Sequence, residues 1–139
     1  MGPIAMALSD EEMHSVAKFF STADAPKAPD DTATTPQEIA KGANIASVGD
    51  WTHGLPACGQ CHGPQGQGVG PSFPALAGQS ASYITAQLVA WQQGARSNDP
   101  LNLMTGVAAK LGDAKVAAVA AYYASLPVPQ GQPAEGAKP

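Results

Sequence analysis

The pentapeptide Cys58-Gly59-Gln60-Cys61-His62 constrains the fold of this 139-residue chain more than any other feature. In a helical turn, residues i and i+3 lie on one face, so both thiols can reach two points on one flat group. The imidazole of His62 follows directly and can approach the centre of that group. C-x-x-C-H is the signature of covalent haem attachment. The sequence therefore predicts one haem, held by thioethers from Cys58 and Cys61, with His62 as a ligand of its iron.

A C-x-x-C pair can also serve as a redox-active dithiol or as half of a zinc site. A thioredoxin-like dithiol needs a strand followed by a helix, and no strand pattern precedes the motif. A zinc site needs about four ligands. His14 and His53 are the other histidines of the chain, and neither has ligand spacing. We expect His53 at the surface or near the haem propionates, not on the iron.

Composition excludes several classes of protein. The net charge is −4 and no basic cluster is present, which argues against binding to nucleic acid. No apolar run reaches the roughly 18 residues that span a bilayer. The first eight residues lack the basic region of a secretory signal peptide. Aromatic residues make up 6% of the chain, and Ala, Gly and Pro are abundant. A haem could therefore complete a core that small side chains fill poorly.

Helical patterns occur in four segments, and no segment has a plausible strand pattern. Capping boxes at Ser9-Asp10-Glu11-Glu12 and Thr35-Pro36-Gln37-Glu38 mark two helix starts. We expect helices over residues 10–21, 36–47, 80–93 and 113–125. The Gly-rich segment 63–78 and the segment 97–103 are expected to be irregular. Loops this long in a compact domain suggest that they wrap a cofactor. The predicted fold class is all-α, with short helices and long loops around one haem.

A second iron ligand would have to come from outside the motif, and a methionine thioether is one candidate donor. The chain has Met1, Met6, Met13 and Met104. Met13 lies on the apolar face of an expected helix, where packing explains it. Met104 follows the irregular segment 98–103 and precedes a short helical stretch, so it could reach the iron from the side opposite His62. Ordinary packing is the alternative for Met104.

The order of these motifs resembles that of class I cytochromes c, and specifically one domain, the C-terminal one, of the di-haem cytochrome c4 type. The resemblance covers about residues 35–126. The matching residues are Pro56-Ala57-Cys58-Gly59-Gln60-Cys61-His62-Gly63, Phe73-Pro74-Ala75-Leu76-Ala77-Gly78-Gln79, Tyr83, Gln87-Leu88, Gly94-Ala95-Arg96, Asn98-Asp99-Pro100 and Met104.

The resemblance implies a role for each matching residue. His62 would be the proximal ligand and Met104 the distal one. Pro74, twelve residues after His62, would accept the Nδ1–H of the histidine through its carbonyl. Arg96 would lie near the haem propionates, although a solvated loop cation is the alternative. Gly42 would let the C-terminal helix cross closely, with Tyr122 or Tyr123 as its aromatic partner. Other candidates for the haem pocket are Phe73, Leu76, Tyr83, Ile84, Leu88, Trp91, Leu101 and Val107.

An internal repeat links the two ends of the chain. When the N-terminal segment is shifted by 103 residues, six identities fall in one ungapped register, and Met1 aligns with Met104. This predicts that residues 1–22 are the end of a preceding cytochrome domain, whose haem Met1 would bind. An N-terminal extension is the alternative. Residues 23–35 would be a linker, residues 36–126 the cytochrome domain, and residues 127–139 a flexible tail.

The function expected from this reading is periplasmic, bacterial electron transfer through a His/Met-ligated haem c, with a second haem in the full-length protein. No acid–base pair or nucleophile is evident, so we expect no enzymatic activity. Partners would be redox proteins: a donor dehydrogenase or membrane complex and an acceptor oxidase or reductase. A second cytochrome c domain or chain is also expected. The alternatives are an electron-acceptor subunit or domain of a dehydrogenase, or a haem sensor or peroxidase in which Met104 is displaceable.

Overall fold

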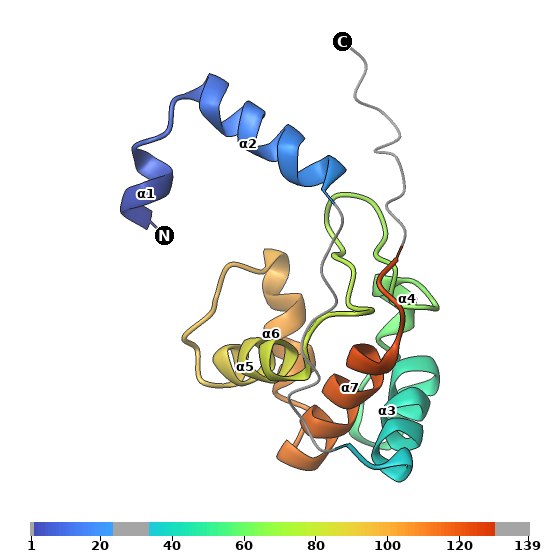
Figure 1. The fold of residues 1–139 in the computed structure, drawn as a ribbon. Helices are drawn as coiled ribbons and strands as arrows, with labels where there is room; N and C mark the ends of the chain where they lie inside the picture. Colours follow the sequence, from blue (N-terminus) through green and yellow to red (C-terminus); the bar gives the residue numbers. More distant parts are fainter. Residues whose placement is uncertain (1, 24–33, 130–139) are drawn as a thin grey trace. The chain divides into compact units, whose positions relative to one another are not determined.

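A computed structural model describes residues 2–23 and 34–129 (Figure 1). These residues divide between two separate units, the first holding residues 2–23 and the second holding residues 34–129. The predicted linker lies almost wholly outside the described residues, as does most of the predicted tail. Within the described ranges, no helix is both long enough and apolar enough to cross a membrane.

The first unit consists of α1 (Gly2–Met6) and α2 (Asp10–Thr22). The predicted capping box starts α2, because the hydroxyl of Ser9 accepts from the Glu12 amide while the Glu12 carboxylate accepts from the Ser9 amide. No residue of either helix is buried. Apolar side chains of both helices are therefore exposed, among them Ile4, Met6, Met13, Val16, Phe19 and Phe20.

The second unit is helical, and its described residues contain no strand beyond two isolated bridges. Its elements, in chain order, are α3 (Pro36–Val48), η1 (Trp51–His53), α4 (Gly59–His62), α5 (Ala81–Gln92), η2 (Pro100–Asn102), α6 (Leu103–Ala108) and α7 (Asp113–Ser125). Helices α3, α5 and α7 correspond to predicted segments within one or two residues at each end. The short turns η1 and η2 were not predicted.

Helices α3 and α7 approach each other closely at Gly42. A Cβ built on Gly42 would overlap the carbonyl oxygen of Ala118 and would lie 2.7 Å from the Cβ of Tyr122. Only glycine leaves room for such an approach. Tyr122 is therefore the aromatic neighbour of Gly42 at this crossing.

Tyr123, on the adjacent face of α7, is almost completely buried. Its burial contributes to one hydrophobic core made by α3, α5, α6 and α7 together with Leu55, which precedes the cysteine motif. Gln92 ties α5 to the end of α6 by donating to the carbonyls of Ala108 at 3.0 Å and Leu111 at 2.6 Å. These contacts fix the frame on which the candidate site residues lie.

Candidate functional site

The cysteine motif forms a single helical turn. The amides of Cys61 and His62 donate to the carbonyl of Cys58, at 3.3 and 3.0 Å. The two cysteines are thus one turn apart, as the i, i+3 spacing predicts. Cys58 is half-buried and Cys61 is exposed. Two thiols on one face, at different depths, suit attachment to one edge of a flat ring that is inserted into the core.

His62 is buried at the end of this turn and is oriented by a backbone carbonyl. Its Nδ1 lies 2.8 Å from the carbonyl oxygen of Pro74. Because a carbonyl only accepts, Nδ1 must carry the proton, which leaves the lone pair of Nε2 free for a metal. The ring of Phe73 meets the imidazole edge-on, with 6.2 Å between ring centroids. This is the arrangement that the resemblance implies for a proximal haem ligand.

The Gly-rich segment after the motif folds back to bring Pro74 to His62. The amide of Gly68 donates to the His62 carbonyl at 2.8 Å, and the amides of Leu76 and Ala77 both donate to the Gly66 carbonyl. Gly66 has a φ of +69°, and a Cβ there would lie 2.5 Å from the Tyr123 ring. The segment therefore needs glycine both for its backbone conformation and for its contact with α7.

Met104 is half-buried, packs against the core and lies in the first turn of α6. Asp99 accepts from the amide of Thr105 at 2.9 Å and from its hydroxyl at 3.0 Å. These hydrogen bonds, the one from the Thr105 amide first, lower the pKa of the Asp99 carboxyl. The Asp99–Thr105 pair was not predicted from the sequence, although Thr105 directly follows the predicted ligand Met104.

Trp91 and Arg96 form a second polar centre near the end of α5. The Arg96 guanidinium lies 4.0 Å from the centre of the Trp91 ring and donates to Gln87 at 2.8 Å and to Asn98 at 2.9 Å. The indole Nε1 of Trp91 is buried and has no acceptor among the described residues. A buried N–H of this kind needs a partner. A haem fits this requirement, because its propionates would bring carboxylate oxygens to an N–H beside a cation.

The other predicted pocket residues differ in how far the structure places them in the core. Ile84 and Leu88 are buried, and Leu76 and Val107 are partly buried against the core. Tyr83 is half-exposed on α5, so its contact with the haem stays a prediction. Leu101 is 89% exposed among the described residues and has a left-handed backbone conformation, so its contact with the haem also stays a prediction.

Tyr123 of α7 also influences the site. From the sequence it was predicted only as a possible aromatic partner of Gly42 at the helix crossing. Burial raises the pKa of the Cys58 thiol, while a hydrogen bond from the Tyr123 phenol acts in the opposite direction. Burial also raises the pKa of Tyr123, so its phenol stays protonated and remains a donor. Tyr123 lies more than sixty residues after Cys58, so this influence on the thiol comes from a helix that is distant in the sequence.

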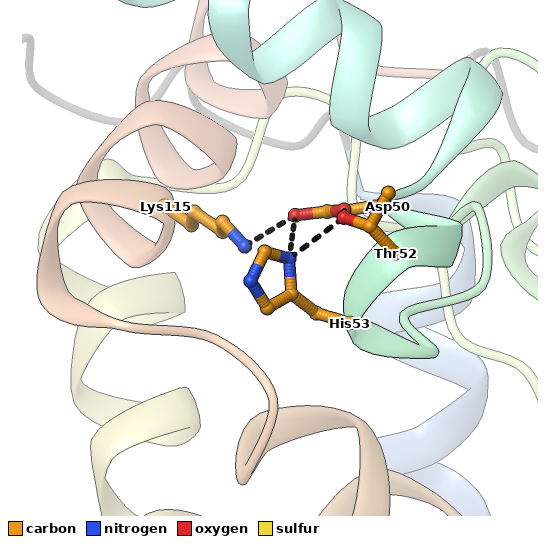
Figure 2. Close-up of polar contacts among 4 residues, drawn as sticks. All are labelled: Asp50, Thr52, His53 and Lys115. Atoms are coloured by element: carbon orange, nitrogen blue, oxygen red, sulfur yellow. Dashed lines mark hydrogen bonds and ion pairs between the residues drawn. The ribbon is translucent and has the colours of Figure 1, made fainter.

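A polar cluster fixes the loop that leads into the cysteine motif (Figure 2). Asp50 accepts from Lys115 of α7 at 2.5 Å and from Thr52 at 2.5 Å, and its other neighbour is Nδ1 of His53 at 2.7 Å. The Lys115 ammonium, followed by Thr52 and His53, holds the pKa of Asp50 far below its usual range. His53 is exposed and is bound to Asp50 within this cluster. Lys110 adds a hydrogen bond to the carbonyl of Gly54 at 2.8 Å.

We expect replacement of Lys115 by Met to destabilise the fold at neutral pH and much less in acid. Because the folded pKa of Asp50 is depressed, its contribution is full above its unfolded pKa of about 4. The contribution is lost as the pH falls through the folded pKa. Urea unfolding at pH 7 and at decreasing pH values measures the difference from the unsubstituted protein. Lys110→Met is the control, because Lys110 bonds a carbonyl and its effect should not depend on pH over this range. Equal pH dependence in both variants would contradict the assignment.

Comparison with known proteins agrees with this geometry. A sequence profile of the cytochrome c family matches residues 39–127. The thiosulfate dehydrogenase electron acceptor of Stutzerimonas stutzeri (strain A1501) is 52% identical over 91% of this chain and 58% of its own length. The chain thus spans little more than half of that relative.

Two solved structures are also similar. Reduced recombinant cytochrome c4 from Pseudomonas stutzeri is 34% identical, with a TM-score of 0.78 over 88% of this chain and 64% of that one. A thiosulfate dehydrogenase from Marichromatium purpuratum is 40% identical, with a TM-score of 0.81 over 92% of this chain and 27% of that one. The chain therefore belongs to the cytochrome c family and carries covalently bound haem c.

Proposed function

We propose that the chain carries single electrons through one haem whose iron is bound by His62 and Met104. The hydrogen bond of 2.8 Å between His62 Nδ1 and the Pro74 carbonyl is the observation that carries the proposal. It fixes the tautomer that presents Nε2 to a metal and makes the imidazole a better donor. The haem supplies a one-electron redox couple when bound. The chain's own residues orient the ligands, exclude water and set the potential.

This ligand pair favours a carrier over an enzyme. If His62 and Met104 fill both axial positions, no position is left for a substrate, and a thioether ligand favours the reduced metal. We therefore propose no catalytic activity for this chain itself. A haem sensor or peroxidase would instead need Met104 to leave the iron readily. Absorption spectra of the reduced protein with and without carbon monoxide separate the two cases. A carrier should form no carbon monoxide adduct, and a stoichiometric adduct would overturn the proposal.

We propose further that the electrons come from a thiosulfate dehydrogenase. The support is the similarity to thiosulfate dehydrogenase electron acceptors, at 52% and 44% identity in two species. Mixing the oxidised protein with such a dehydrogenase and thiosulfate should reduce its haem within the turnover time of the enzyme. Omission of either the enzyme or thiosulfate should leave the haem oxidised. If the complete mixture leaves the haem oxidised while horse heart cytochrome c is reduced in parallel, this donor is wrong.

The resemblance to cytochrome c4 also supports a place in the bacterial periplasm. In bacteria, covalent attachment of haem to a C-x-x-C-H motif is completed there. Fractionation of the source cells, followed by a denaturing gel stained for haem, tests this. Haem staining at the mass of the full-length protein in the periplasmic fraction is expected. Staining confined to the cytoplasm would contradict the proposal.

A preceding haem domain is proposed for the full-length protein, on the basis of the internal repeat. The bounds of α2 and α7 differ by 103 residues at both ends, which is the register of the repeat. Positions buried in α7 are exposed in α2. Val119 is 4% exposed and its counterpart Val16 is 44% exposed, whereas Tyr123 is 1% and Phe20 is 68% exposed. An apolar helix face normally packs against a hydrophobic core. The exposed apolar face of α2 is therefore expected if the rest of its domain is not part of this chain.

In that domain Met1, which lies outside the described residues, would bind the iron as Met104 does here. Native mass spectrometry of the full-length gene product should give the mass of two haems, and a redox titration should show two waves. A single haem together with the absence of a second C-x-x-C-H in the gene would overturn this part of the proposal. The carrier function of residues 36–126 would not be affected by that result.

A further inference from the structure

The backbone just before Met104 is strained. Leu101 and Asn102 have φ angles of +58° and +55°, and they are the non-glycine residues with positive φ among those described. In the left-handed region the Cβ of an L-residue crowds the next carbonyl oxygen. Asn tolerates this conformation, whereas a bulky residue such as Leu rarely adopts it. Leu101 is 89% exposed, so no other part of the described chain packs over its side chain to compensate for the strain.

The side chain of Asp99 closes this strained turn. Its Oδ2 accepts from the amide of Thr105 at 2.9 Å, and its Oδ1 accepts from the Thr105 hydroxyl at 3.0 Å. The carbonyl of Asp99 also accepts from the amide of Asn102 at 3.2 Å. Asn102 is at the N-cap position of α6 but makes no side-chain capping bond. Asp99, three residues before Asn102, therefore accepts the hydrogen bond from the first turn of α6 that an N-cap side chain would normally accept.

Met104 lies inside the segment that Asp99 closes. Its position is set on one side by the left-handed pair and on the other by Thr105, whose amide and hydroxyl are both bound to the carboxylate. Strained backbone persists only where its surroundings over-determine it, and such places often have a functional role. Without the Asp99 bonds the turn could relax to ordinary dihedral angles, and the first turn of α6 would move with it.

We propose that Asp99 is a positioning residue for Met104, which holds the strained turn closed so that the thioether stays on the haem iron. The inference rests on the proposed His62/Met104 ligation. It predicts that the loss of the Asp99 carboxylate opens the methionine side of the haem to small ligands. The fold of the remaining core should be affected much less, because most of the buried core residues lie on α3, α5 and α7 and not in this turn.

The test is a titration of the oxidised haem-loaded protein with imidazole, followed by loss of the methionine–iron absorption band. In Asp99→Ala the apparent affinity for imidazole should rise about tenfold or more. The hydrogen bonds to the charged carboxylate stabilise only the state in which Met104 is on the iron, so their loss favours the state that imidazole binds. Asp99→Asn keeps one acceptor oxygen and should give a smaller rise. Thr105→Val removes only the hydroxyl bond and should also be intermediate. Asp113→Ala is the matched control, since it removes an exposed carboxylate in the first turn of α7.

Each outcome separates this inference from the function on which it rests. If the unsubstituted protein lacks a methionine–iron band, the proposed ligation fails first. If the band is present and Asp99→Ala binds imidazole no more tightly than Asp113→Ala, the positioning role is wrong while the ligation stands. A lower thermal midpoint in Asp99→Ala with unchanged imidazole affinity would likewise overturn the proposal, because it would show a role in stability alone. A graded rise from Asn to Ala supports it.

Discussion

Replacement of Met104 by alanine is expected to abolish the methionine–iron absorption band and to lower the reduction potential of the haem. The thioether stabilises the reduced iron, and water or another nitrogen or oxygen donor in its place does so less well. Axial ligands shift haem potentials over a range of about 0.8 V, so we expect a decrease on the order of 0.1 V or more. Visible spectroscopy of the oxidised protein and a potentiometric titration measure the two effects.

The matched control for this substitution is Met6→Ala, which removes a thioether that is almost fully exposed in α1. It should leave both the band and the potential unchanged. An unchanged spectrum in Met104→Ala would instead identify another donor. His53 would then be the first residue to test, because its Nδ1 is engaged by Asp50 and its Nε2 is not part of that contact. The double substitution with His53→Ala would distinguish a new ligand from an original one.

The helices could be predicted because the signals that start them are local. Ser9 with Glu12 and Thr35 with Glu38 each form both bonds of a capping box within four residues. Helix α7 begins and ends at the predicted residues, 113 and 125. The turn from Cys58 to His62 is likewise a short-range feature, set by the spacing of the motif. Local chemistry was sufficient for these elements, because each is set by partners that are near in sequence.

Contacts between distant residues could not be read from the same patterns. Lys115 binds Asp50, which lies 65 positions earlier in the chain, and no sequence motif at either residue predicts this contact. The contact of Tyr123 with Cys58 also depends on how α7 crosses the molecule. The left-handed turn at Leu101 could not be predicted either, because hydrophobicity does not report backbone dihedral angles.

The close crossing of α3 and α7 predicts that one added methyl group, at Gly42, lowers the stability of the fold substantially. In Gly42→Ala the new Cβ would overlap the Ala118 carbonyl oxygen and would lie 2.7 Å from the Tyr122 Cβ. Backbone cannot yield as a flexible side chain does, so the two helices must separate along their shared core. We expect a loss of about 3 kcal/mol in the free energy of unfolding, at the upper end of overpacking costs. Urea unfolding of the haem-loaded protein, followed by circular dichroism, measures it.

Gly106→Ala provides the comparison, because Gly106 is also a helical glycine of the second unit. A Cβ built there meets no other atom of the chain within 4 Å, so no protein contact changes and the helix propensity is the expected effect. This variant should gain up to about 1 kcal/mol, since alanine is the better helix former. The same gain in propensity applies at Gly42, and the steric cost must exceed it for the predicted sign to hold. Stability that rises in both variants would mean that α3 and α7 lie farther apart in the haem-loaded protein. Opposite signs would show that the absence of a side chain at Gly42 is what allows α3 and α7 to approach this closely.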